Sequence, residues 1–399
     1  MLTYGTVAGM ERLCMPVLFK EISTDLNLSV VSLGTIWGMD PLAGIFVGVI
    51  GGALADRFGM KRTLGVICIL AGLFSALRGL STGFWSLAAS MFLFGGMAAM
   101  TPSISPKTAA IWFERKQLGL INAFINLSWS VGAMIATMTT ATFLSPAVGG
   151  WQNALFILSI PAVIVGILWF VTGRDPVKNE TEKAQAGSNP VAFNEPVQVP
   201  LRQALSHVIH LKEVWLLGFI SLALWGANTG FIGYLPLYLR NQGWEPAAAD
   251  GLFTVFNGAS MAGMIPMVLL ANRLKAHKRV LFLSLVITVA FMALTPIVSS
   301  GFLWAVILTA TFLRSAAFAI TNVLIFEIKG VGSTYGGTAT GLVSSIAMIG
   351  AFAAPPLGNS LAAVGTGAPF FFWAGLASIS LPVFLLFGQK KALAPDAPS

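Results

Sequence analysis

The segment GGALADRFGMKR, residues 51–62, decides how the chain is interpreted, because it places a charged turn between two long apolar stretches. Apolar stretches of about 20 residues are long enough to cross a bilayer as helices. Gly59 permits a tight turn. Arg57, Lys61 and Arg62 hold that turn on one side of a membrane. The segment therefore predicts a short connection between two transmembrane helices.

The composition of the whole chain supports a membrane protein. Of its 399 residues, 56% are apolar and only 10% are charged, whereas soluble domains carry about 25% charged residues. A chain this poor in polar side chains could not cover a surface in water. Soluble enzymes, nucleic-acid-binding proteins and disordered proteins are therefore excluded, and we expect an all-α polytopic membrane protein.

Twelve apolar stretches follow one another along the chain, and we expect each to form one transmembrane helix. Their approximate ranges are 2–20, 30–55, 63–80, 85–111, 118–143, 152–172, 213–239, 248–271, 280–298, 301–326, 335–362 and 367–388. A polar insert at residues 173–212 predicts a linker that ends in a short amphipathic helix. It separates two six-helix halves, residues 1–172 and 213–399, and the second half ends in a short tail.

The basic residues predict the orientation of these helices. If the N-terminus is cytoplasmic, 17 of the 23 lysines and arginines fall in cytoplasmic segments, three fall in outside loops and three fall within spans. The three in outside loops are Lys20, Arg78 and Arg240. We therefore expect both termini and the linker to be cytoplasmic, in a bacterial or archaeal plasma membrane. The net charge of +8 is then a topology signal and no indication of nucleic-acid binding.

The two halves resemble each other in sequence. MPVLFKE from Met15 matches LPLYLRN from Leu235, and NAFINLSWSVGAM from Asn122 matches TGLVSSIAMIGAF from Thr340. LADRFGMKR has a weaker counterpart in LANRLKAHKR after the eighth span. The three pairs occur in the same order, at offsets of about 216 to 220 residues. A duplicated six-helix unit is typical of transporters whose site lies between two halves that rock against each other.

The loop between spans two and three resembles the signature of the major facilitator superfamily, and the twelve-span layout extends this resemblance over the whole chain. The residues that carry it are Gly52, Asp56, Arg57, Gly59, Lys61 and Arg62. Met60 departs from the pattern, since many members have a base there, and Asn272 replaces the expected acid in the second half. The resemblance implies that Asp56, Arg57 and their neighbours act as a gate that stabilises the outward-open state. The alternative is a plain turn with charges that set topology.

Four ionisable residues lie near mid-span: Glu11, Arg12, Asp40 and Arg314. Each costs about 2.5–3.5 kcal/mol to insert, so each needs a partner or a function. Glu11 and Arg12 are adjacent and diverge by about 100° around their helix, so they cannot readily pair. One possibility is a structural pair between Arg12 and Asp40. In the other, Arg12 binds an anion while Glu11 or Asp40 carries a coupling proton.

The resemblance places helices one, four, seven and ten around a central cavity. Arg314 would present a planar, permanently charged group there for a carboxylate, unless it pairs with an acid on another helix. Arg12 and Arg314 would then hold one anion between the halves. Further candidates for substrate contact are Asn126, Trp129, Trp225, Asn228, Asn257 and Asn322.

The sequence thus predicts a secondary active transporter that moves a small organic anion, a monocarboxylate, together with a proton by alternating access. We expect a monomer in the lipid bilayer, with no cofactor, no metal site and no catalytic residue. The alternatives are a proton-driven exporter of hydrophobic compounds and a non-transporting receptor on the same fold. The absence of a Gly-Pro-Gly-Gly motif in span five disfavours drug–proton exchange.

Overall fold

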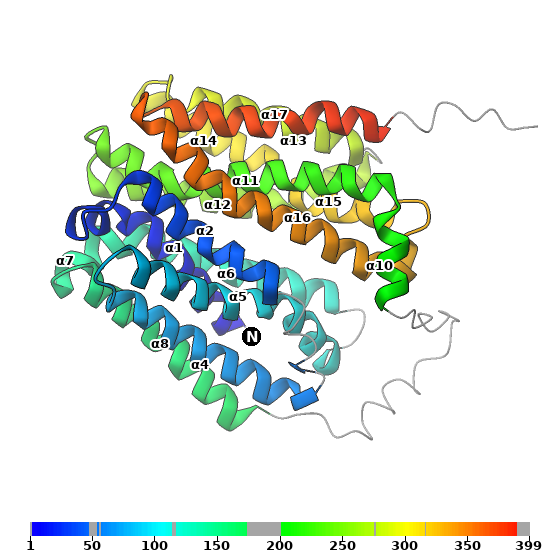
Figure 1. The fold of residues 1–399 in the computed structure, drawn as a ribbon, viewed down its shortest axis with the longest axis horizontal. Helices are drawn as coiled ribbons and strands as arrows, with labels where there is room; N and C mark the ends of the chain where they lie inside the picture. Colours follow the sequence, from blue (N-terminus) through cyan, green and yellow to red (C-terminus); the bar gives the residue numbers. More distant parts are fainter. Residues whose placement is uncertain are drawn as a thin grey trace, which may run out of the picture.

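The computed structural model describes residues 2–47, 54–55, 57–113, 117–173, 201–274, 277–315 and 317–388. All regular elements within these ranges are helices. The long helices run roughly side by side along the longest dimension of the molecule (Figure 1). This part of the chain is therefore the all-α bundle that the sequence predicts.

The N-terminal half, as the term is used below, extends from α1 to α8. Its long helices are α1 (Leu2–Asp25), α2 (Val30–Val47), α4 (Met60–Gly79), α5 (Phe84–Trp112), α6 (Leu118–Thr139) and α8 (Trp151–Thr172). Between α6 and α8 lie a π-helical turn, η1 (Thr140–Leu144), and a short helix, α7 (Ser145–Val148).

The C-terminal half follows the short helix α10 (Leu201–Ile209), which lies where the sequence predicts an amphipathic helix. Its elements are α11 (Lys212–Asn241), α12 (Pro246–Arg273), α13 (His277–Leu294), α14 (Ser300–Arg314), α15 (Ala317–Phe326), α16 (Gly332–Ser360), η2 (Leu361–Ala363) and α17 (Ala368–Gly388). The C-terminal half occupies the upper part of Figure 1, and the N-terminal half the lower part.

Ten helices in the described ranges are long and apolar enough to cross a membrane. The two spans missing from this set are α1 and the pair α14–α15. They are also the spans that contain Glu11, Arg12 and Arg314. Together with the ten they give the twelve membrane helices that the sequence predicts.

The tenth span is not the single helix expected over 301–326. α14 ends at Arg314 and α15 begins at Ala317. Ser315 donates both its backbone N–H, at 3.3 Å, and its Oγ, at 2.7 Å, to the carbonyl of Phe312. These bonds to the residue three positions earlier replace the regular helical pattern and tighten the last turn of α14. Arg314 therefore lies directly at the helix break.

Close backbone contacts hold the helices together within each half. A Cβ atom added at Gly132 on α6 would lie only 1.7 Å from the carbonyl oxygen of Thr6 on α1. One added at Gly9 would lie 2.1 Å from the carbonyl oxygen of Trp129. Small residues that let backbones approach are the usual means of packing helices in lipid. Glycines on both helices thus fix α1, with its charged pair, against α6.

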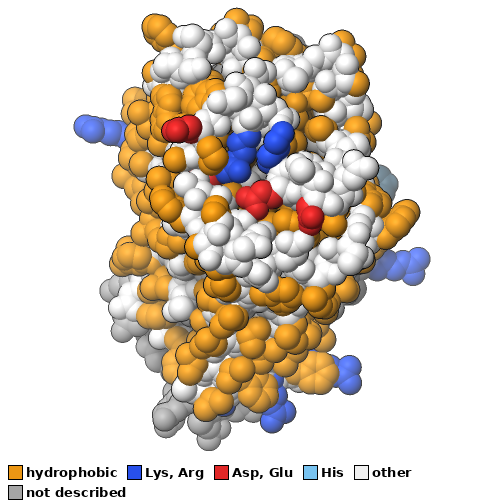
Figure 2. All heavy atoms as spheres, turned by 90° about the vertical axis from the view of Figure 1, so that its left-hand side faces the viewer, with side chains coloured by type: hydrophobic (Ala, Val, Ile, Leu, Met, Phe, Trp, Pro, Cys, Tyr) orange, Lys and Arg blue, Asp and Glu red, His pale blue; other side chains and the backbone are white. Residues whose placement is uncertain are grey.

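The halves are joined near one end of the molecule, on the left in Figure 1. We call it the closed end; it carries the connections at residues 26–29, 80–83, 242–245 and 364–367. Hydrogen bonds between the halves lie there. Lys20 Nζ donates to Asn241 Oδ1 at 2.6 Å, and Asn359 Nδ2 donates to the carbonyl of Val30 at 2.8 Å. The few charged side chains on this face gather in one patch (Figure 2).

A buried ion pair strengthens this closure. One guanidinium nitrogen of Arg240 lies 2.7 and 2.8 Å from the two carboxylate oxygens of Asp250, whose side chain is fully buried. Thr142 of the N-terminal half donates to Asp250 Oδ2 at 2.6 Å. Arg240 and Asp250 both belong to the C-terminal half, so the hydrogen bond from the Thr142 hydroxyl connects this ion pair to the N-terminal half. Asp250 thereby connects the halves through a charge-assisted hydrogen bond.

Replacing Asp250 by Asn should loosen the closed end, because Thr142 loses its charged acceptor and Arg240 its counter-ion. A hydrogen bond worth about 1 kcal/mol corresponds to a change of roughly fivefold in the ratio of closed to open molecules. Spin labels at Thr82→Cys and Val364→Cys, two exposed positions in closed-end connections of the two halves, should report this change as a larger long-distance population in double electron–electron resonance.

Asp25→Asn is the matched control, since Asp25 accepts its bonds from Trp151 and Gln152 within the N-terminal half. It should leave the distance distribution unchanged. Equal distributions for Asp250→Asn and the unsubstituted protein would show that the pair does not hold the halves together.

Candidate functional site

Arg314 is a buried cation without a counter-ion among the residues that the structure describes. Only 4% of the residue is exposed, and its Nη2 donates to Asn228 Oδ1 on α11 at 3.0 Å. The guanidinium carbon lies 5.1 Å from the ring centre of Phe256 and 5.0 Å from that of Phe291. Its Nε has no hydrogen-bond partner. One neutral amide and two aromatic faces compensate the charge only partly, so the group can still bind an anion.

Arg12 forms an ion pair with Asp40, one of the alternatives that the sequence left open. Arg12 Nε lies 2.6 Å from Asp40 Oδ2, which joins α1 to α2. The Asp40 side chain is 6% exposed, but that of Arg12 is 29% exposed. The guanidinium carbon of Arg12 also lies 5.9 Å from the ring centre of Trp37. The pair therefore leaves part of the Arg12 guanidinium accessible.

Trp37 brings the two arginine sites together. Its Nε1 donates across the boundary to the carbonyl of Thr229 at 3.0 Å. Thr229 follows Asn228, the partner of Arg314, and Asp40 lies one helical turn beyond Trp37. Both sites are thus within about one turn of a single inter-half contact.

The same contact separates the two arginine sites from the closed end. A Cβ at Gly233 would lie 2.6 Å from the Trp37 ring, and one at Gly38 would lie 2.6 Å from the carbonyl of Phe352. The sequence did not predict these close contacts of Trp37 and Gly38 with the C-terminal half. Their only sequence signal was a Trp-Gly pair two residues before Asp40.

Glu11 occupies a different environment from Arg12. It is completely buried within the N-terminal half, and neither carboxylate oxygen has a hydrogen-bond partner there. Arg78 contacts this residue, since its Nη1 donates to the backbone carbonyl of Glu11 at 2.8 Å. Arg78 also lies 4.4 Å from the ring centre of Phe94.

Two arginines predicted in outside loops are therefore placed differently. Arg78 lies fully buried in the last turn of α4, beside Glu11. Arg240 lies in the last turn of α11, where it pairs with Asp250. The loop assignment was wrong because a base at a helix end looks the same in sequence whether it points to water or to a buried acid.

The predicted asparagines divide into different groups. Asn228 binds Arg314, as described. Asn126 and Asn257 each donate back to a carbonyl of their own helix, at 2.9 Å, and Asn126 is exposed while Asn257 is buried. Trp129 packs against the main hydrophobic cluster. The side chain of Asn322 lies outside the described residues.

The signature loop is described only in part. Asp56 and Gly52 lie outside the described residues. Gly59 has a φ of +86°, a conformation that favours glycine, and it begins the turn into α4. Arg57 and Arg62 are exposed, and the Lys61 side chain lies close to Gly173 at the end of α8.

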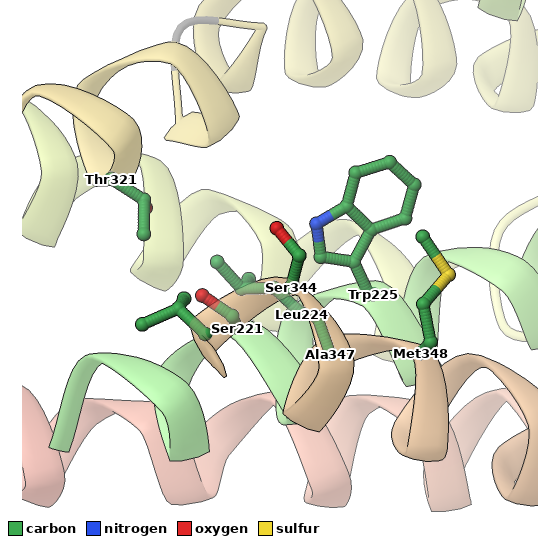
Figure 3. Close-up of a pocket in the computed structure, with 8 residues that line it drawn as sticks. Ser221, Leu224, Trp225, Thr321, Ser344, Ala347 and Met348 are labelled. Carbon is green, nitrogen blue, oxygen red and sulfur yellow. The ribbon is translucent and has the colours of Figure 1, made fainter. Parts of the chain in front are cut away.

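A pocket lies in the C-terminal half, next to Asn228. It has a volume of about 100 Å³ and is formed by α11, α15 and α16. Ser221, Leu224 and Trp225 line it from α11, Thr321 from α15, and Ser344 and Met348 from α16 (Figure 3). Trp225 was a sequence candidate, whereas the others were not, because isolated serines and methionines in apolar helices carry no distinctive signal.

Known proteins resemble this chain over most of its length. It is 26% identical to a phosphoglycerate transporter protein of Salmonella typhimurium, over 60% of this chain and 53% of that relative. The chain thus spans about half of that relative's length. It is 25% identical to a 3-(3-hydroxy-phenyl)propionate transporter of Escherichia coli, over 100% of this chain and 96% of the relative.

A solved structure has the same fold. The bacterial homologue of the human lysosomal transporter Spinster superposes with a TM-score of 0.80 at 14% identity, over 99% of this chain and 98% of that chain. These relatives and this neighbour are transporters, not enzymes. The family model described as Major Facilitator Superfamily matches residues 1–336. With twelve membrane helices and two intramembrane arginines beside the contact between its halves, the chain belongs to the Major Facilitator Superfamily.

Proposed function

We propose that the protein is a secondary active transporter of a small monocarboxylate, moved together with a proton by alternating access. The observation that carries this proposal is Arg314, a buried guanidinium with one neutral hydrogen-bond partner and an Nε without any. A carboxylate can accept two parallel bonds from such a group and neutralise it. Binding of the substrate would then repay the cost of burying the arginine.

Arg12 is the second anion-binding group in this proposal. Its exposed part is accessible to a ligand, while its Nε binds Asp40. Arg12 belongs to the N-terminal half and Arg314 to the C-terminal half, so one anion between them draws the halves together. A substrate bound by both arginines contacts both halves, and it therefore takes part in any movement of one half relative to the other.

Asp40 is the proposed carrier of the coupling proton. An anion that engages Arg12 competes with Asp40 for the same guanidinium. Without its ion-pair partner, the buried carboxylate of Asp40 would be an uncompensated charge, which a coupling proton neutralises. Glu11 is the alternative carrier; its full burial beside Arg78 argues for a structural role instead.

The relatives support an anionic substrate. The two transporters compared above are named for phosphoglycerate and for 3-(3-hydroxy-phenyl)propionate, both of which carry a carboxylate. A carboxylate on each of these compounds is the kind of group that the two intramembrane arginines could bind.

Orientation and gating complete the proposal. The distribution of basic residues favours cytoplasmic termini, in which case the closed end faces outward. Asp56, Arg57, Gly59, Lys61 and Arg62 would then form a cytoplasmic gate in the outward-open state. We further propose that the protein acts as a monomer in a bacterial or archaeal plasma membrane.

Arg314→Ala should abolish carboxylate uptake. The loss of a charge-assisted bidentate contact lowers affinity by roughly 10- to 100-fold. Uptake of labelled propionate and its aryl derivatives into proteoliposomes, with and without an inward proton gradient, measures this. Arg314→Lys should keep part of the activity, because it retains the charge without the planar geometry.

Arg279→Ala is the control for this experiment, since Arg279 is an exposed base at the opposite end of the C-terminal half. It should transport normally. If folded, unsubstituted protein moves no carboxylate but expels hydrophobic cations, the monocarboxylate proposal is wrong and the exporter alternative replaces it.

Asp40→Asn should uncouple transport from protons. Stimulation of net uptake by the gradient should fall to a ratio of about 1, because an amide cannot exchange a proton in this range. Exchange of labelled for unlabelled substrate, which needs no net proton movement, should persist. Glu11→Gln is the comparison variant and should keep the stimulation; the reverse pattern would assign the coupling proton to Glu11.

A further inference from the structure

The pocket beside Asn228 continues the anion site toward the opposite end from the closed end. Asn228, Trp225, Leu224 and Ser221 are spaced three or four residues apart, so they form one stripe along α11. Asn228 binds Arg314, and the other three line the pocket. The distance from the Arg314 contact to the pocket is about one helical turn, roughly 5 Å.

The pocket also adjoins the boundary between the halves. The sulfur of Met348 lies 3.8 Å from the position that a Cβ would take at Gly44 on α2. Gly44 lies one helical turn beyond Asp40, the partner of Arg12. Met348 therefore connects the pocket to the same region of the N-terminal half that carries the second arginine. A ligand held by the arginines has the pocket directly beside it.

The chemistry of the pocket suits an uncharged ring. None of its eight lining residues is ionisable, and the indole of Trp225 lies beside Ser344 and the thioether of Met348 (Figure 3). Aromatic rings and thioethers both make favourable contacts with a planar ring. The volume of about 100 Å³ is of the order needed for one six-membered ring, since an apolar cavity of about 150 Å³ in another protein binds benzene.

Two hydroxyls of the pocket make no hydrogen bond within the described part of the protein. Thr321 donates to the carbonyl of Ala317 at 2.8 Å, and Ser345, next to the pocket, donates to that of Gly341 at 3.0 Å. Ser221 and Ser344 make no such bond to their own helices, although serines in membrane helices commonly do. Their hydroxyls are left to pair with a polar substituent on a ligand.

We propose that Ser221, Trp225, Ser344 and Met348 form a subsite for a hydroxylated aromatic ring whose side-chain carboxylate is bound by Arg314. This ring subsite rests on the proposed function. One helical turn between guanidinium and pocket matches a spacer of about two carbon atoms. Polyhydroxylated sugar acids fit less well, because two unpaired hydroxyls cannot satisfy four or five buried substituents.

Equilibrium binding of labelled 3-(4-hydroxyphenyl)propionate to the purified protein tests the proposal, with unlabelled 3-phenylpropionate, propionate and glucuronate as competitors. We expect the hydroxylated ring to bind about tenfold tighter than the unsubstituted ring. Propionate and glucuronate should compete more weakly than either. The Ser221→Ala/Ser344→Ala variant should lose the tenfold preference, while Ser345→Ala, altered at a hydroxyl already bonded to its own helix, should keep it.

Trp225→Leu should lower the affinity for both aryl acids by about tenfold and leave competition by propionate unchanged. Trp225→Phe keeps an aromatic ring and should retain most of the affinity. It thereby distinguishes loss of the ring contact from a folding defect at this position. Trp304→Leu, altered at a partly exposed tryptophan on α14, is the matched control.

Three outcomes would overturn the ring subsite: glucuronate competing better than phenylpropionate, a preserved preference in the double serine variant, or an equal loss for propionate and aryl acids in Trp225→Leu. In each case Arg314→Ala would still abolish carboxylate binding, and the proposed function would stand. If the folded protein binds none of the four acids, the proposed function fails as well, and the ring subsite with it.

Discussion

Arg314 places a permanent positive charge inside the bundle, where it meets one amide and two phenylalanine rings. An arginine at such a depth costs about 2.5–3.5 kcal/mol on insertion scales. Several features of the C-terminal half accommodate it: the break between α14 and α15, Asn228 on the facing helix, and aromatic faces from α12 and α13. The partial compensation makes the site stable enough to fold and still receptive to an anion.

The N-terminal half carries a second charge at a site with different properties. Arg12 already has an acidic partner in Asp40, but remains partly exposed. Trp37 lies beside this pair and bonds across the boundary to the residue next to Asn228. An anion that binds to either arginine therefore lies next to the Trp37 contact, which borders the closed end. Closer to the surface of the closed end, the Thr142–Asp250–Arg240 cluster also joins the two halves. Binding and closure are thus linked through neighbouring residues on α1, α2 and α11.

The fold could be predicted from sequence because apolar length and basic-residue placement are local properties. The four mid-span charges were equally visible, since any ionisable residue stands out in an apolar stretch. The pairing of Arg12 with Asp40 was one of the two alternatives that the sequence offered, whereas the other buried partners were not visible. Arg78 looked like a loop base but lies beside Glu11, and Asp250 at the start of a span gave no indication of Arg240 or Thr142. The division of the tenth span depends on how Ser315 bonds to Phe312, which no hydropathy pattern contains. The contacts of Arg78 with Glu11 and of Thr142 with Asp250 are decided by packing between helices far apart in sequence.

The most direct test of the central claim is a structure of the protein determined with a saturating bromine-labelled monocarboxylate, such as 3-(4-bromophenyl)propionate. The account predicts carboxylate density within hydrogen-bond distance of the Arg314 guanidinium, including its Nε, with the bromine signal about one helical turn away near Trp225. Carboxylate density elsewhere, with Arg314 still bonded only to Asn228 or paired to an acidic side chain of the protein, would contradict it.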